Sequence, residues 1–128
     1  MENPGPLFRR RLLIDSLLVV AADASVQVSW LVNHGVSADE ITLDFDHACR
    51  MAERLAEAGH LDHQVLPGLR EIDTVFSEMS GEGNADRWTE DALSSDEGWN
   101  QARRLARRVL DVEVGGWDQP LPEITVIR

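Results

Sequence analysis

The apolar segment between residues 7 and 33 constrains the fold of this chain more than any other feature. Its apolar side chains occur around most of a helical wheel. Four polar side chains share one narrow strip of one face: Ser16, Asp23, Gln27 and His34. A helix of this kind must be surrounded by protein, either its own chain or a second subunit. Gly35 can end it, and we therefore expect one continuous, central helix.

The start of the same segment has the layout of a secretory signal, with three arginines, an apolar run over residues 12–22 and small residues around Asp23. Asp15 argues against a signal, because a charge inside such a run costs about 2.5–3.5 kcal/mol on insertion scales. The helical pattern also continues past the cleavage point. Asp15 and Asp23 make the segment a poor membrane span. We expect a soluble, cytoplasmic protein that does not bind membranes.

A second helix is predicted for residues 37–59. Ser37 and Glu40 have the spacing of a capping box, and Gly59 can end the helix. Its apolar residues recur at helical spacing: Ile41, Phe45, Ala48, Ala52 and Leu55. A competing interpretation makes residues 41–45 a short strand, since apolar residues also alternate there.

Two more helices complete the pattern. One begins near Pro67, a residue suited to a first helical turn. Thr89 can cap a short turn, and Ser94 with Glu97 forms a second capping box for a helix over residues 95–111. Residues 124–127 are expected to form a short strand or a packed tail.

These elements predict an all-α fold. A chain of 128 residues is one ordinary domain, so residues 1–128 are assigned to a single helical domain. Short connections favour antiparallel neighbours. We therefore expect an up-down bundle of four main helices, with a central apolar first helix and an extended C-terminal segment.

The net charge of −11 is concentrated in one part of the chain. Residues 36–100 contain sixteen acidic residues and four arginines, a net charge of −12. This balance argues against nucleic acid as a ligand, because binding to phosphates needs dense positive charge. The densest acidic part surrounds Trp88 and consists of Glu82, Asp86, Glu90, Asp91, Asp96 and Glu97.

Two interpretations of this acidic part remain open. It is either a solvated face with Trp88 packed into the core, or a surface that binds a basic protein with Trp88 as its anchor. The candidate partner-binding residues are Asp86, Trp88, Glu90, Asp91, Asp96 and Glu97. The last helix adds an exposed, arginine-rich face that consists of Arg103, Arg104, Arg107 and Arg108. This face pairs with the chain's own acids, binds an anion or a partner, or contacts the acidic segment of a second copy.

Catalytic and metal chemistry has less support. Side chains of metal-ligand type cluster in the second helix and after it: Asp44, Asp46, His47, Cys49, His60, Asp62 and His63. They lack the spacing of a known zinc motif. The single Cys49 excludes an internal disulfide and falls on the apolar side of its helix. We expect no catalytic residue, cofactor or metal.

Three functional hypotheses follow. The first is a non-catalytic acidic interaction protein, such as an inhibitor or immunity-like partner of a basic protein. The second is a metal- or small-ligand-binding helical enzyme that uses His47, His60 and His63. The third is a homodimeric scaffold protein, suggested by the apolar first helix.

Overall fold

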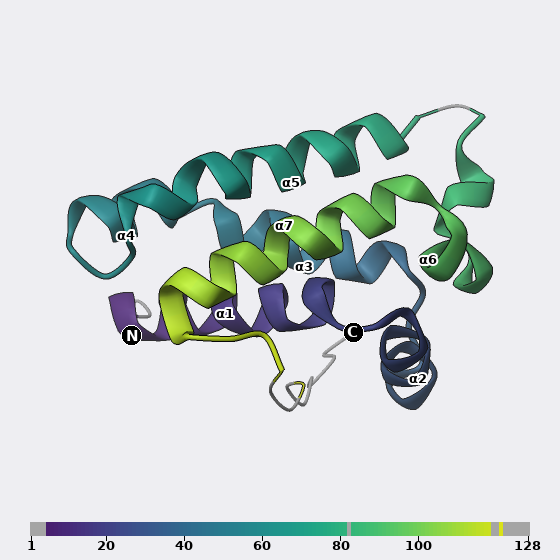
Figure 1. Cartoon of the computed structure of the whole chain (residues 1–128), viewed down its shortest axis with the longest axis horizontal. Coiled ribbons are helices and arrows are strands. Elements are labelled where there is room, and N and C mark those ends of the chain that lie inside the picture. The colour runs from purple at the N-terminus through teal and green to yellow at the C-terminus, as the bar shows by residue number, and fades with distance from the viewer. Residues whose placement is uncertain (1–4, 82, 119–120, 122–128) are drawn as a thin grey trace.

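The computed structural model describes residues 5–81, 83–118 and 121, which form seven α-helices and two short 3₁₀ helices and include no strand (Figure 1). The elements are α1 (Pro6–Ala21), α2 (Ala24–His34), α3 (Asp39–Cys49), α4 (Ala52–Glu57), η1 (His63–Val65), α5 (Leu66–Met79), η2 (Ala85–Trp88), α6 (Glu90–Ser95) and α7 (Glu97–Val114). The predicted all-α class is confirmed.

Four of the helices contact one another in a closed ring. α1 packs against α3 and α7, and α5 packs against α7 and α3. In Figure 1 these four run along the length of the molecule, while α2, α4 and α6 lie at its ends. The short α2 and α6 also contact each other, which joins the two connections at that end of the molecule.

The core is built around aromatic side chains from three of these helices. Trp99 and Phe45 are fully buried, and Phe76 lies between them. The ring centroids of Phe76 lie 5.8 Å from Phe45 and 5.4 Å from Trp99, within the range of favourable aromatic pairs. Leu13 and Leu17 on α1 are also fully buried. The second half of α1 is therefore largely surrounded by its own chain.

The prediction of one continuous first helix was wrong. The segment divides into α1 and α2, which are bent by 120° at a break after Ala21. Ala22 is extended there, with φ −65° and ψ 154°. No Gly or Pro marks this position, and contacts with distant residues hold it, as described below. No single helix in the described part of the chain is long and apolar enough to cross a membrane.

The second predicted helix also divides in two. Residues 41–45 lie inside α3, so the strand alternative was wrong. α3 ends at Cys49, and α4 begins at Ala52. The predicted capping box is not formed: the Ser37 hydroxyl donates to the Asp39 carboxylate, and the residue before α3 makes no side-chain cap.

The later helices begin close to their predicted starts. Pro67 lies in the first turn of α5, and Thr89 caps α6 by accepting from the Ala92 N–H. The second capping box is not formed, because Ser94 donates to the Asp91 carbonyl and Asp96 caps α7 instead. The predicted strand or tail at 124–127 lies outside the described residues.

Candidate functional site

The acidic segment that contains the candidate residues is fixed by two helix caps. Thr89 accepts from the Ala92 N–H at 3.2 Å, and Asp96 accepts from the Gly98 N–H at 2.7 Å. Each cap satisfies a backbone donor that has no partner within its helix. The segment therefore presents its remaining side chains from a defined backbone.

Asp96 has a structural role in addition to its cap. Its carboxylate accepts two hydrogen bonds from Arg87, from Nε at 2.9 Å and from Nη2 at 3.2 Å. The Arg87 hydrogen bond is the main reason that the pKa of Asp96 lies below its usual value. The negative charges of Asp86 and Glu78 act on the same guanidinium. Glu78, at the end of α5, thus belongs with the acidic candidate residues, and we call this group the acidic end: Glu78, Asp86, Glu90, Asp91, Asp96 and Glu97.

Trp88 is half-buried and engaged within the protein. Its indole N–H donates to the Met79 carbonyl at 2.9 Å. Its ring packs edge-on against Trp99 with centroids 5.6 Å apart. The indole of Trp99 donates in turn to the Arg87 carbonyl at 2.8 Å. These contacts tie the acidic segment to the core through the aromatic pair.

The other candidate residues are exposed carboxylates. Asp86, Glu90 and Asp91 form no ion pair with any residue that the structure describes. Glu97 pairs with Arg104 at 3.0 Å on the surface. Pairs of this kind contribute little to stability because water screens both charges. The three unpaired carboxylates are therefore accessible to a cationic partner.

The predicted metal-ligand side chains do not converge. Within residues 5–81, 83–118 and 121, no group of three or more His, Cys, Asp or Glu side chains could hold a metal ion. His47 and His63 are exposed, and His60 is half-buried. Asp62 instead caps η1 by accepting from the Gln64 N–H at 2.8 Å.

Cys49 lies in a surface hollow of about 390 Å³ between the α3–α4 region and α5. Its thiol is half-buried. Burial raises the pKa of this thiol to about 12, and the nearby carboxylates of Asp73 and Asp46 add to the effect. A thiol with this pKa is protonated at neutral pH, which opposes nucleophilic chemistry.

The sequence analysis missed a buried polar network at the α1–α2 break, which we call the elbow. Arg103 on α7 is 8% exposed. It donates to the Ala22 carbonyl at 2.8 Å, the Leu93 carbonyl at 2.9 Å and the Gln27 side-chain oxygen at 2.8 Å. A fourth hydrogen bond goes to Asn100 at 2.8 Å. The buried cation is thus solvated by protein oxygens.

Gln27 and Arg107 complete the elbow. The Gln27 amide donates to the carbonyls of Val19 and Val20 at 3.0 and 3.1 Å. Arg107 donates to the Ala21 carbonyl at 2.8 Å and to the carboxylate of Asp23 at 2.9 Å. The carbonyls that α1 leaves unpaired at its C-terminus therefore receive donors from α2 and α7.

These contacts correct the predicted exposed arginine face. Arg104 and Arg108 are exposed, but Arg103 is buried and Arg107 is half-buried. A signal for Arg103 was present, because it lies four residues after Trp99 and therefore on the apolar side of the helix. Its acceptors could not be identified, since the break that presents them carries no local sequence signal.

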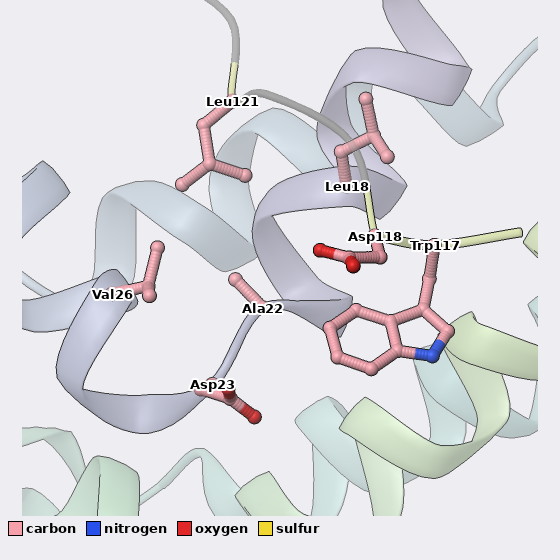
Figure 2. A pocket seen from close by; sticks show the side chains of 7 residues that line it. All are labelled: Leu18, Ala22, Asp23, Val26, Trp117, Asp118 and Leu121. Atoms are coloured by element: carbon pink, nitrogen blue, oxygen red, sulfur yellow. The ribbon is translucent and has the colours of Figure 1, made fainter.

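A pocket of about 570 Å³ opens beside the elbow. Figure 2 shows its apolar lining and the carboxylates of Asp23 and Asp118 nearby. The lining residues are Leu18, Ala22, Asp23, Val26, Trp117, Asp118 and Leu121. The Trp117 ring centroid lies 3.6 Å from the Arg107 guanidinium carbon, a cation–π contact. The pocket thus combines an apolar floor with negative charge.

No protein-family model, curated protein or solved structure matches this chain. Two surface features of the described residues differ in their chemistry: the acidic end and the elbow pocket. The acidic end offers unpaired charge, and the elbow pocket offers apolar space.

Proposed function

We propose that this chain is a non-catalytic interaction protein that binds a basic protein through its acidic end. The acidic end comprises Glu78, Asp86, Glu90, Asp91, Asp96 and Glu97. An inhibitor or immunity-like protein that covers the basic surface of its target is the specific form of this proposal. Electrostatic attraction would accelerate the encounter, and complementary charge would select the partner.

The observation that carries the proposal is the exposure of Asp86, Glu90 and Asp91 without ion pairs in the described part of the chain. The caps at Thr89 and Asp96 hold their backbone in place. Little conformational entropy would be lost when a partner binds to such a segment. Trp88 supports the surface from below in this proposal, because its indole already binds Met79.

The scaffold that we propose for this role is an up-down bundle of four main helices. α1, α3, α5 and α7 are its members, supported by their mutual contacts. The short α2, α4 and α6 serve as connections at the ends of the bundle. In this arrangement Asp86, Glu90, Asp91 and Asp96 of the acidic end lie in the connection between α5 and α7, and such a connection can vary without disturbing the core.

Charge reversal at the acidic end tests the proposal. The variant Glu90→Lys/Asp91→Lys replaces two exposed carboxylates in the first turn of α6. Wild-type protein and variant are used to capture proteins from a lysate of the source organism. We expect the wild type to retain a basic protein that the variant loses. With that purified partner, association should be at least about tenfold slower for the variant and less sensitive to salt.

The control is Glu57→Lys/Glu71→Lys, which changes the net charge equally at two exposed positions on α4 and α5. This variant should capture the same partner with nearly the same association rate. Equal loss of binding in both variants would indicate a general effect of net charge. Unchanged binding in the Glu90→Lys/Asp91→Lys variant would remove the acidic end as the binding surface.

A further inference from the structure

The first half of α1 leaves large apolar side chains in solvent. Leu7 is 73% exposed, Phe8 53% and Leu12 39%. Val112 is exposed as well, near the end of α7, where Glu113 pairs with Arg10 of α1. Several such side chains on one helix indicate an interaction surface.

This face of α1 has a two-fold pattern in its sequence. At 100° per residue, Phe8, Arg11, Asp15 and Leu18 lie within an arc of about 80°. Arg11 and Asp15 are each two residues from Leu13, and Phe8 and Leu18 are each five residues from it. When two such helices are placed antiparallel and centred on Leu13, the cation of one helix lies opposite the anion of the other. The exposed ring of one helix then lies opposite the apolar pocket wall of the other.

We propose that a second copy of this chain binds here, with the two α1 helices antiparallel and the two-fold axis at the level of Leu13. Arg11 of each copy then faces Asp15 of the other. Phe8 of each copy faces Leu18 of the other and enters its elbow pocket. The contact is isologous, so each feature is used twice. This dimer is independent of the proposed binding of a basic protein.

The elbow pocket suits an aromatic side chain. Its volume of about 570 Å³ exceeds the size of a phenyl ring, and Leu18, Ala22, Val26 and Leu121 supply apolar contacts. Phe8 and Leu18 are ten residues apart on α1, or about 15 Å along the axis. Figure 2 shows Leu18 and Ala22 among the side chains that line the pocket. Each copy therefore carries both the ring and a site for it at a fixed separation.

Charge favours the same arrangement. Antiparallel pairing brings the N-terminal end of one α1, with its arginines, toward the elbow pocket of the other copy. The carboxylate of Asp118 lies at that pocket, whereas the carboxylate of Asp23, also at the pocket, already pairs with Arg107. The positive end of the helix dipole adds to the attraction. Arg11 and Asp15, which lie 3.7 Å apart within one chain, would form a ring of four alternating charges in the dimer.

The first test is the mass in solution, measured by sedimentation equilibrium from micromolar to hundred-micromolar concentration. We expect the wild type to approach twice the chain mass as concentration rises. Phe8→Asp should remain monomeric with unchanged helical circular dichroism. The control Leu43→Asp replaces another exposed apolar residue, on α3, and should dimerise like the wild type.

A charge-swap experiment tests the register. Asp15→Arg leaves two basic residues at positions 11 and 15, whereas Arg11→Asp leaves two acidic residues there. Both variants lose the same ion pair within the chain, so their helices are affected alike. Each alone should be monomeric, whereas an equimolar mixture should recover the dimer. A mixture that stays monomeric while the wild type dimerises would overturn the antiparallel register.

A wild type that remains monomeric throughout this range overturns the proposal. A basic, apolar helix face could instead bind an anionic membrane surface. Sedimentation with phosphatidylserine-containing vesicles distinguishes a membrane from a second copy of the chain as the binding partner of this face. A monomeric wild type that sediments with these vesicles, when Phe8→Asp does not, would assign the face to a membrane and overturn the dimer.

Discussion

At the residue scale, Arg103 shows how this fold accommodates a buried charge. A buried ion without compensation is costly, and no carboxylate in the described part of the chain forms an ion pair with Arg103. Burial lowers the pKa of Arg103, yet a guanidinium remains protonated in proteins. Backbone oxygens of Ala22 and Leu93 take the place of a counterion. Both lie near helix C-termini, where the helix dipole is negative.

Replacing Arg103 should therefore be among the most destabilising single changes in this chain. Arg103→Leu leaves the carbonyls of Ala22 and Leu93 and the Gln27 side chain without their donor. A buried acceptor that loses its donor typically costs about 1–3 kcal/mol, and three acceptors are left here, so we expect a loss of about 3 kcal/mol or more. Urea denaturation measures the free energy of unfolding.

The control for this prediction is Arg104→Leu, the next residue on the same helix. Its pair with Glu97 is exposed, and such pairs are worth about 0–1 kcal/mol. The free energy of unfolding should therefore change by less than about 1 kcal/mol. Similar losses for the two variants would show that the elbow network does not hold the fold.

Cys49 allows a prediction about reactivity. With a pKa of about 12, its thiolate fraction at neutral pH is about a thousandfold below that of an ordinary thiol of pKa near 9. Alkylation by iodoacetamide should be at least about a hundredfold slower than for free cysteine. The rate should rise about tenfold per pH unit up to pH 10, as the thiolate fraction rises. A plateau near pH 9 would contradict the raised pKa.

At this scale, the sequence predicted burial better than it predicted partners. Cys49 was assigned to the apolar face of its helix, and it is half-buried. Arg103 was assigned to an exposed face because its charge was weighed above its position four residues after Trp99. Its partners, Ala22 and Gln27, are separated from it by more than seventy residues. No local pattern specifies such a pairing.

At the element scale, the caps of the acidic segment connect its structure to pH. The pKa of Asp96 is lowered in the folded state, mainly by Arg87. A carboxylate of this kind stabilises the fold above its unfolded pKa, and the contribution is lost as the pH falls through the folded pKa. Asp96 should therefore stabilise the start of α7 at neutral pH and lose this effect in acid.

The variant Asp96→Asn tests this contribution, because asparagine can still cap α7. It removes the charge that binds Arg87, so we expect a loss of about 1–2 kcal/mol in unfolding free energy at pH 7. The difference in unfolding free energy between the variant and the wild type should decrease below pH 4. The control Glu71→Gln removes an exposed carboxylate in the middle of α5 and should change stability by less than about 0.5 kcal/mol. A loss of unfolding free energy in Asp96→Asn that does not change with pH would contradict the stabilising role of the Asp96 charge.

Element boundaries were predictable where local chemistry sets them. Pro67 and Thr89 marked the starts of α5 and α6 because a first-turn proline and a capping hydroxyl act within a few residues. The elbow was missed because residues 21–24 contain no helix breaker. Donors from α7 bind the carbonyls that have no partner within α1, and a local stretch of sequence does not show these donors.

At the scale of the whole molecule, the candidate surface was located by charge alone. The count of acidic residues identified the segment around Trp88, and the structure places its carboxylates mostly in solvent. The elbow pocket was not predicted, because it combines Leu18, Val26 and Leu121 from distant parts of the chain. Charge density can be counted along the sequence, whereas a pocket depends on which segments the fold brings together.

The net charge of −11 leads to a prediction for the whole fold. Repulsion among like charges destabilises a compact state, whereas the ion pairs between described residues are mostly exposed and weak. Repulsion should therefore dominate, and screening by salt should stabilise the protein. Between low salt and half-molar sodium chloride, we expect the midpoint of thermal unfolding to rise by about 4 °C.

The variant Glu90→Lys/Asp91→Lys provides the comparison, since it reduces the net negative charge by four units. Its midpoint should rise less with salt than that of the wild type, because less repulsion remains to be screened. Dimerisation also changes the midpoint, and its contribution depends on protein concentration. Measurements at two concentrations therefore separate the two effects. A midpoint that falls with salt at both concentrations would show that ion pairs outweigh net charge in this fold.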